Sequence, residues 1–304
     1  MNGSIADRQA EQRVILRKAL AALEAGGITP VLLKGLSLAH YYPKPEERPA
    51  GDIDIYVGKE HYHDGARILR ETFPDAPHFD EEAEYFKHYN LNVGSTAIEM
   101  HRVSADFKHP RDARVYDELE REGLQRHFVR YERGEDKWNE PEYNFNVLFV
   151  FIHSWHHFTT GSASLRQFTD LAYLLVGGKP DVTYLEKNLK RLHLLQAWQL
   201  YAYILVNYLS LPQESCPLYT DKCARRAQLL FQSMLHPKRA FSEETKVPAP
   251  KNVILRKLFT LRVRLHEARA IARFEPHYAR HLVLTAFAQS WDRFKKGEST
   301  RKWE

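Results

Sequence analysis

The sequence predicts an α+β fold for the first half of the chain and an all-helical second half. Short apolar runs alternate with helical patterns up to about residue 103. After Pro141 the apolar residues recur at helical spacing, and prolines separate the segments. The length of 304 residues suffices for two domains, each with a core of its own. We therefore expect a mixed domain over residues 1–135 and a helical domain over residues 136–304.

The elements expected in the first half follow from periodicity and from turn residues. They are a helix over 7–25, a strand over 29–33, a short helix over 34–42, a strand over 52–57, a helix over 61–72, and strands over 84–92 and 95–103. Gly26-Gly27 ends the first helix in the manner of a C-cap, and three prolines between 43 and 49 mark a loop.

Six helices are expected in the second half. They cover residues 143–157, 164–176, 182–192, 194–208, 224–235 and 253–274. The last of them carries six basic residues and one acidic residue. A solvated face is the ordinary interpretation of such a helix, and binding to RNA or to an anionic membrane surface is the alternative.

The composition excludes several classes of protein. Hydrophobic residues make up 43% of the chain and charged residues 27%, which excludes wholesale disorder, collagen and coiled-coil fibres. The longest apolar stretches are much shorter than the roughly 18–20 residues of a membrane-spanning helix, and the first residues form no apolar signal segment. The two cysteines lack CxxC spacing, which disfavours a disulfide framework or a structural zinc site. We therefore expect a cytoplasmic protein without a transmembrane segment.

Asp52 and Asp54 are the first candidates for chemistry. Side chains alternate between the two faces of a strand, so these aspartates share one face while isoleucines take the other. Two adjacent negative charges are costly unless a cation neutralises them, and such oxygen ligands suit Mg²⁺ or Mn²⁺. In the strand over 95–103, Glu99 and His101 share the face opposite to their apolar neighbours. Glu99 would join the two aspartates if the strands are neighbours in one sheet.

Basic and glycine residues near this pair suit phosphate binding. Lys34-Gly35 stands where a strand turns into a helix, and the unpaired N–H groups at a helix start attract phosphate. Gly35 permits close approach of a triphosphate, and Lys34 adds a positive charge. Arg48 would clamp a phosphate through two hydrogen bonds, and Gly51 lets a ligand approach the aspartates. In the alternative interpretation Lys34 is a solvated lysine and Arg48 pairs with neighbouring glutamates.

Four motifs together resemble a known family. They are LLKG at Leu32–Gly35, R-x-x-G-D-I-D-I at Arg48–Ile55, I-E-M-H at Ile98–His101, and the histidines of residues 153–157 followed by L-R-Q-F-T-D-L at Leu165–Leu171. At these residues the chain resembles the uncharacterised nucleotidyltransferase family within the DNA polymerase β-like nucleotidyltransferase superfamily. The resemblance covers most of residues 28–175.

The resemblance implies a polymerase β-like domain with a small mixed sheet, followed by a helical domain. It also implies that Asp52, Asp54 and Glu99 bind the metal ions and that the Lys34-Gly35 turn receives the nucleotide phosphates. The sequence departs from the superfamily at two places, because Lys-Gly stands where Gly-Ser is usual and Glu99 stands where aspartate is usual. Ser37, two residues after the turn, is the candidate for the missing hydroxyl.

The second half offers residues for the cleft or for structural support. His153 and His157 lie one helical turn apart, as in zinc-binding helices, but no catalytic glutamate lies between them and the segment is aromatic. We favour packed or hydrogen-bonded histidines that line the cleft over a metal site. Arg166 and Asp170 have the spacing of an intrahelical ion pair. The resemblance favours a place for both at the cleft.

These observations predict transfer of a nucleoside monophosphate from an NTP to an acceptor hydroxyl, with Mg²⁺ or Mn²⁺ as cofactor and pyrophosphate as product. The acceptor is a small molecule, a protein side chain or an RNA end, and the sequence does not choose among them. The alternative is a non-catalytic module that binds nucleotide or RNA on the same fold. The Lys-Gly turn and the basic helix over 253–274 favour this alternative. The sequence predicts no oligomeric state.

Overall fold

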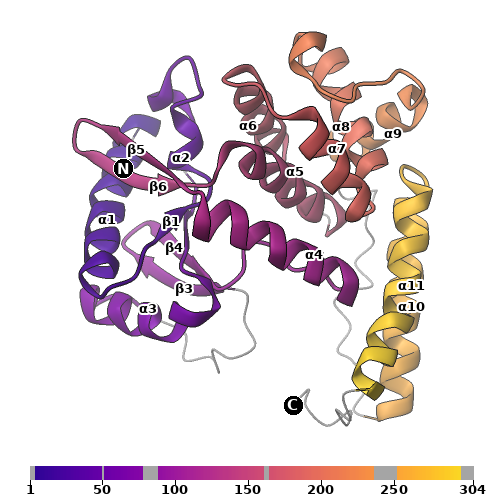
Figure 1. Ribbon diagram of the computed structural model, residues 1–304, viewed down its shortest axis with the longest axis horizontal. Coiled ribbons are helices and arrows are strands. Elements are labelled where there is room, and N and C mark those ends of the chain that lie inside the picture. The colour runs from indigo at the N-terminus through magenta and orange to yellow at the C-terminus, as the bar shows by residue number, and fades with distance from the viewer. Residues whose placement is uncertain (1–3, 50, 78–87, 161–163, 236–251, 296–304) are drawn as a thin grey trace. The chain divides into compact units, whose positions relative to one another are not determined.

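The computed structural model describes residues 4–49, 51–77, 88–160, 164–235 and 252–295. The chain divides into two compact units (Figure 1). Unit 1 comprises Met1–Asp106 and Glu118–Phe149, and unit 2 comprises Phe107–Asp117 and Val150–Glu304. Unit 1 holds the sheet, and the described elements of unit 2 are helices.

Unit 1 contains a six-stranded mixed sheet with the strand order β3-β4-β2-β1-β6-β5. The strands are β1 (Val31–Leu32), β2 (Ile53–Tyr56), β3 (His88–Val93), β4 (Thr96–His101), β5 (Val129–Arg133) and β6 (Asp136–Glu140). β2 runs parallel to β4 and β1 parallel to β6, and the other neighbours are antiparallel. β1 to β4 form where the sequence predicts strands, and residues 84–87 of the third predicted strand lie outside the described residues.

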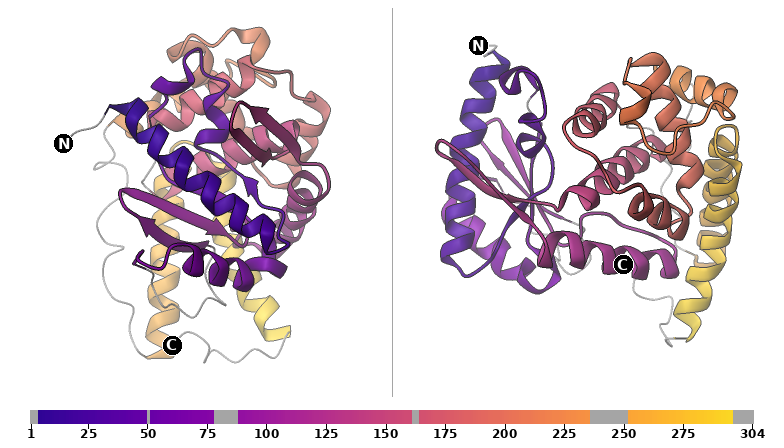
Figure 2. Two further views of the ribbon diagram at one scale, coloured as in Figure 1. Left: turned by 90° about the vertical axis from the view of Figure 1, so that its left-hand side faces the viewer. Right: turned by 45° about the horizontal axis from the view of Figure 1, so that its top comes forward.

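Two helices cover the sheet and determine which of its faces is buried. α1 (Ile5–Ala25) and α3 (Gly58–Thr72) pack against each other and against the sheet (Figure 2). Their apolar residues share a core with Ile53, Ile55 and Ile98 of the sheet. Full burial of one aliphatic side chain contributes roughly 1.5–3 kcal/mol, so these isoleucines hold β2 and β4 in one orientation. The acidic side chains between them take the opposite face.

The ends of α1 follow from its sequence. Ser4 and Asp7 form a capping box, in which each side chain accepts a hydrogen bond from the other residue's backbone N–H. At the far end Gly27 has a φ of 78°, a conformation that glycine adopts without strain. The predicted helix over 7–25 is therefore present, two residues longer at its start.

The hairpin of β5 and β6 is a feature that the sequence reading missed. Gly134 forms its turn with a φ of 60°, and Tyr131 stacks on Trp138 with ring centroids 4.6 Å apart. β6 also pairs with β1, because Asn139 lies opposite Val31. The sheet therefore extends past residue 135, the boundary expected from the sequence, and unit 1 continues to Phe149. Charged residues on both strands hide the alternation that would have indicated them, although the end of β6 is buried.

The described elements after Glu140 are helical. They are α5 (Tyr143–Thr159), α6 (Leu165–Val176), α7 (Val182–Arg191), α8 (Leu195–Tyr208), η3 (Gln213–Ser215), α9 (Ala224–Leu235), α10 (Val253–Ala272) and α11 (Pro276–Lys295). All six predicted helices are present, whereas α11, α4 (Pro110–Glu120) and the following η2 (Arg121–Arg126) were not predicted. Residues 236–251 and 296–304 of the predicted helical domain lie outside the described residues.

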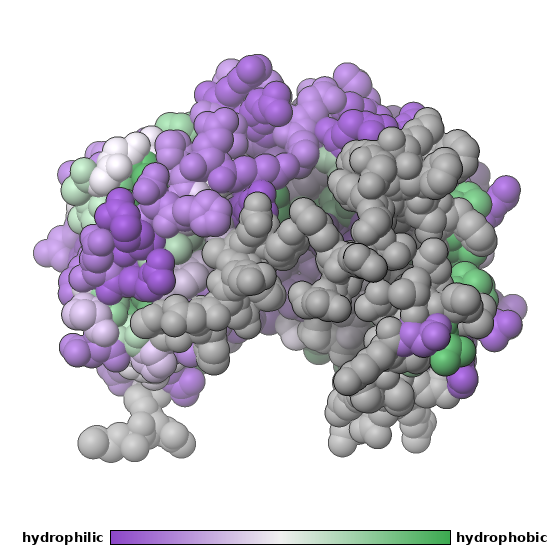
Figure 3. Space-filling model, turned by 90° about the horizontal axis from the view of Figure 1, so that it is seen from below, coloured by the Kyte–Doolittle hydropathy of each residue, from purple (hydrophilic) through white to green (hydrophobic). Residues whose placement is uncertain are grey.

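Aromatic side chains form much of the core of unit 2. Phe168 stacks on Tyr201 with ring centroids 4.2 Å apart, and Trp155 and Trp198 are fully buried. On the face shown in Figure 3 the described surface is mostly hydrophilic, with hydrophobic residues in small clusters. None of the helices in the described ranges has the length and apolar character needed to cross a bilayer.

Candidate active site

The pairing of β2 with β4 brings two of the predicted carboxylates together. Asp54 lies opposite Glu99 in this parallel pair, so both side chains take the same face of the sheet. Asp52 immediately precedes β2 and is exposed, two residues from Asp54. Asp54 is fully buried, with 0% of its surface exposed, whereas Glu99 is partly exposed. The two strands are therefore neighbours in one sheet, which was the condition for Glu99 to join Asp54.

Lys34 contributes the positive charge of this group. β1 pairs antiparallel with β2, and the N–H of Leu33 donates to the carbonyl of Asp54 at 2.9 Å. Lys34 follows directly, and its ammonium lies 2.6 Å from Asp54 Oδ2. At this distance the ammonium and the carboxylate form a close ion pair.

His101 holds the other oxygen of Asp54. Its Nε2 lies 2.9 Å from Asp54 Oδ1 and 3.7 Å from Glu99 Oε2. A carboxylate can only accept, so Nε2 carries the proton and donates a hydrogen bond to Asp54. Sequence analysis placed His101 on this face but gave it only a supporting role. Its contact with Asp54 fits that role, because it fixes the orientation of the carboxylate.

Charges around Asp54 outweigh the effect of burial. Burial alone would raise the pKa of the Asp54 carboxyl, but the charge of Lys34 and the hydrogen bond from His101 lower it far below its ordinary range. Burial likewise acts to lower the pKa of Lys34, and Asp54, Glu99 and Asp52 together raise it. Lys34 therefore lies in the combined field of all three predicted carboxylates.

His88 extends the group on the other side of β4. It lies opposite His101 in the β3–β4 pair, and the two rings are 5.2 Å apart. Ligand atoms of His88, Glu99 and His101 lie within 4.8 Å of one another, a distance compatible with a shared metal ion. Two imidazoles and one carboxylate suit Mn²⁺ or Zn²⁺ better than Mg²⁺, which prefers oxygen ligands. Sequence analysis missed His88, whose only signal was its place in a predicted strand.

The predicted phosphate turn is tighter than the sequence suggested. Gly35 has a φ of 72°, and a Cβ there would lie 3.1 Å from the backbone oxygen of Asp52. The helix that follows, α2 (Leu36–Ala39), has only four residues. Ser37 is fully buried within it, and its hydroxyl has no hydrogen-bond partner among the described residues. Binding of phosphate by Gly35 and Ser37 stays a prediction.

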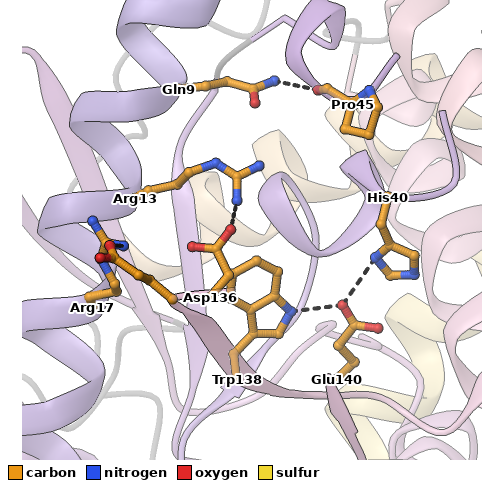
Figure 4. A network of polar contacts seen from close by, with 9 residues as sticks. Gln9, Arg13, Arg17, His40, Pro45, Asp136, Trp138 and Glu140 are labelled. Carbon is orange, nitrogen blue, oxygen red and sulfur yellow. Dashed lines mark hydrogen bonds and ion pairs between the residues drawn. The ribbon is translucent and has the colours of Figure 1, made fainter. Parts of the chain in front are cut away.

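Two glutamines of α1 hold the loop that carries Arg48 and Gly51. Gln9 Nε2 donates to the carbonyl of Arg48 at 2.6 Å, and Gln12 Nε2 donates to the carbonyl of Gly51. The loop includes a 3₁₀ turn, η1 (Pro45–Glu47), to which Gln9 also donates (Figure 4). Arg48 is 5% exposed, and its guanidinium lies 5.9 Å from the ring centroid of Tyr42. Its predicted role as a phosphate clamp stays a prediction.

Unit 1 contains another buried carboxylate, Glu140, at the end of β6. Trp138 Nε1 donates to its Oε1 at 2.7 Å, and His40 Nδ1 lies 3.5 Å from the same oxygen (Figure 4). Burial raises the pKa of Glu140 to about 7, and burial together with the charge of Arg133 lowers the pKa of His40 to about 4. Both side chains are therefore held in a site that favours their neutral forms.

The remaining predicted residues lie in unit 2. His153 and His157 are partly exposed on α5, with ring centroids 4.4 Å apart. On α6, Arg166 is exposed and Asp170 is 7% exposed. Their expected place at the cleft stays a prediction.

Comparison with known proteins gives one result. The model of an uncharacterised nucleotidyltransferase family matches residues 2–210, well over half of the chain. The chain belongs to this family. The match to the nucleotidyltransferase family includes every strand of the sheet and helices α5 to α8, whereas α9, α10 and α11 lie beyond it. No curated protein and no solved structure matches the chain.

Proposed function

We propose that the chain transfers a nucleoside monophosphate from an NTP to an acceptor hydroxyl and releases pyrophosphate. In this proposal Asp52, Asp54 and Glu99 hold a divalent cation, Mg²⁺ or Mn²⁺, and Lys34 binds the triphosphate. Unit 1 is then a polymerase β-like nucleotidyltransferase domain, and the helices after it select the acceptor. The acceptor is a small molecule, a protein side chain or an RNA end.

The observation that carries the proposal is the position of Lys34 among the three carboxylates. All three charges raise the pKa of its ammonium, and Asp54 contacts it at 2.6 Å. A fully buried aspartate is costly to ionise without a cation beside it. The three carboxylates therefore already attract one positive charge of the chain, the Lys34 ammonium. Membership of a nucleotidyltransferase family indicates the class of reaction.

The donor set fits a hard divalent cation. Asp52, Asp54 and Glu99 bring three carboxylates against one ammonium, so the group keeps a net negative charge. Lys34 lies against Asp54 Oδ2 and His101 against Oδ1, and each carboxylate oxygen has a second lone pair for a ligand. When bound, the cation would lower the pKa of the acceptor hydroxyl and neutralise charge on the leaving pyrophosphate.

Each protein group then has a task of its own. Lys34 would turn from Asp54 to a phosphate oxygen once a bound divalent cation neutralises the Asp54 carboxylate. His101 keeps Asp54 oriented through its 2.9 Å hydrogen bond. Glu99 is partly exposed and would accept the proton of the acceptor hydroxyl.

One observation favours the alternative, a module that binds nucleotide or RNA without turnover. The Lys34–Asp54 pair compensates the buried charge within the chain itself. Such a site is stable without a metal ion and would still offer its remaining carboxylates and Lys34 to a nucleotide.

Pyrophosphate release decides between the two functions. The four NTPs are incubated with the full chain, Mg²⁺ or Mn²⁺, and acceptor pools of sugars, RNA ends and proteins, with a label on the α-phosphate. The proposal expects pyrophosphate release and labelled acceptor, both lost by at least about 100-fold in Glu99→Gln, as when one charge-stabilising group is removed.

Glu60→Gln is the matched control, because Glu60 is an exposed glutamate on α3 outside the carboxylate group. It should retain wild-type rates. Protection from heat by an NTP, with no pyrophosphate from any combination, would instead assign the chain to the binding module.

A further inference from the structure

Unit 2 contains a group of potential metal ligands that shares no residue with the group around Asp54. His109 immediately precedes α4, Asp112 lies in its first turn, and His281 lies on α11. Their ligand atoms lie within 4.8 Å of one another. Asp112 and His281 are 169 residues apart in the sequence, so the fold itself brings them together.

The aspartate lies between the two histidines. His281 Nε2 lies 2.5 Å from Asp112 Oδ2 and donates a hydrogen bond to it when no ion is bound. A metal ion bound at Nε2 would displace this proton to Nδ1 or to solvent. His109 Nδ1 lies 3.6 Å from the other oxygen, Oδ1, and the two imidazole rings are 4.8 Å apart. The separation of 3.6 Å is too long for a hydrogen bond. It is close to the separation of about 3.3 Å between two ligands of a tetrahedral ion with bonds near 2.0–2.1 Å.

The unsatisfied oxygen of Asp112 is the second observation that points to a ligand. Asp112 is 2% exposed, and its Oδ1 accepts no hydrogen bond from the described residues. Buried polar atoms are nearly always paired, so an exception calls for an unseen partner. Within the described ranges the ion-pair partners of Asp112 are histidines, whereas Asp54 is paired with Lys34. The remaining polar contact of the group is weak, since the N–H of Arg111 donates to His109 Nδ1 at 3.3 Å.

We propose that His109, Asp112 and His281 bind one transition-metal ion of the zinc class. Two imidazole nitrogens and one carboxylate oxygen are ligands that Zn²⁺ prefers, and a fourth position remains for water or another side chain. His193 is adjacent, because its ring lies 4.3 Å from that of His281. The ion would join the start of α4 to α11, which lies beyond the residues matched by the family. Because these residues are not part of the carboxylate group around Asp54, the proposal of this metal site does not rest on the proposed nucleotidyl transfer.

Zinc retention by the full, untagged chain tests the proposal. Wild type and variants are dialysed against a series of free Zn²⁺ concentrations set by a chelator, and bound zinc is measured. Wild type should hold one more equivalent of zinc than His109→Gln or His281→Gln. Where binding persists in these variants, its affinity should fall by roughly 10–100-fold or more. Mg²⁺ at millimolar concentration should not displace this equivalent, because it binds imidazole poorly.

His61→Gln is the control, since His61 is an exposed histidine on α3 in unit 1. It should bind as much zinc as wild type. His109→Gln carries the decision because His109 is partly exposed and its replacement leaves the core intact, which the circular dichroism spectrum checks. Equal zinc retention by wild type and His109→Gln overturns the proposal. So does an equal loss in His61→Gln, which would indicate adventitious binding to surface histidines.

Discussion

Asp54 and Glu140 are two buried carboxylates of one sheet with opposite electrostatic surroundings. Asp54 is 0% exposed and Glu140 is 5% exposed. Each has a histidine nitrogen near it, His101 at 2.9 Å from Asp54 and His40 at 3.5 Å from Glu140. Within the described residues Asp54 also has an ammonium beside it, that of Lys34 at 2.6 Å, whereas the ion-pair partner of Glu140 is His40. Accordingly the pKa of Asp54 is lowered, whereas burial raises that of Glu140 to about 7.

The comparison shows that a neighbouring cation, more than the degree of burial, decides whether a carboxylate in this sheet stays charged. It also gives two opposite pH dependences. The stability that Asp54 contributes is complete above its ordinary pKa of 3.8 and is lost as the pH falls below it. The contribution of Glu140 is complete below its ordinary pKa of 4.5 and is lost as the pH rises to about 7.

Replacing Lys34 should have the largest effect, because it would make Asp54 resemble Glu140. Lys34→Met leaves a fully buried carboxylate without its cation, and breaking such a pair costs about 3–5 kcal/mol. The lower figure applies here because 20% of the Lys34 side chain is exposed. Urea unfolding at pH 7 measures the loss. Mn²⁺ should reduce it if the carboxylate group holds a cation.

Lys44→Met is the matched control for charge and size. Lys44 forms an ion pair with Glu47 at 2.7 Å, but both side chains are 64% exposed. Its loss should cost about 0–1 kcal/mol. If the two variants lose equal stability, the Lys34–Asp54 pair has no special weight and the comparison with Glu140 fails.

Glu140 offers the opposite test, because its charged form is the one that destabilises. Glu140→Gln keeps an oxygen for the Trp138 hydrogen bond and removes the titration. At pH 8 the variant should be more stable than wild type by on the order of 3 kcal/mol, since each unit of pKa shift corresponds to about 1.4 kcal/mol. At pH 4 the two proteins should be equally stable. Urea unfolding between pH 4 and pH 8 measures the difference.

The sign of this result matters more than its size. A wild type that gains stability from pH 4.5 to 7 relative to Glu140→Gln would mean that Glu140 is charged and paired, as Asp54 is. Glu132→Gln on strand β5 is the control for the substitution itself, because its side chain is exposed.

The sequence predicted which side chains of a single strand share a face, but not which strands lie next to each other. Alternation in β2 placed the aspartates opposite the isoleucines, and the isoleucines do enter the core. The Lys34–Asp54 pair escaped prediction because it depends on the antiparallel pairing of β1 with β2, a contact between segments that no local pattern encodes. The sequence therefore predicts Lys34 as a phosphate ligand or a solvated lysine, and not as the partner of Asp54.

Other features were not predicted because they too depend on contacts between segments far apart in the sequence. The cluster of Asp112 and His281 joins residues 169 positions apart. The environment of Glu140 depends on the β5–β6 hairpin, for which Gly134 and the aromatic residues Tyr131 and Trp138 were the signals in the sequence. Hydrophobic periodicity reports which face of an element is buried. It does not report which element lies next to it.

The smallest effect concerns Gly35, which sets the path of the chain directly after Lys34. Gly35→Ala should cost about 1–3 kcal/mol, because Gly35 combines a φ of 72° with a ψ of −115°, a conformation that residues with a Cβ rarely adopt. Gly27→Ala is the matched control, because its φ of 78° resembles the 72° of Gly35 while no atom lies within 4 Å of its added Cβ. At Gly35 that Cβ would lie 3.1 Å from the Asp52 carbonyl oxygen, so the backbone must also shift. Urea unfolding should therefore show a greater loss of stability for Gly35→Ala than for Gly27→Ala.

A shift of the turn would also move Lys34 relative to Asp54 and raise the pH at which acid unfolds the protein. Equal losses in the two variants, with an unchanged acid midpoint, would mean that the close approach of the turn to Asp52 does not position Lys34.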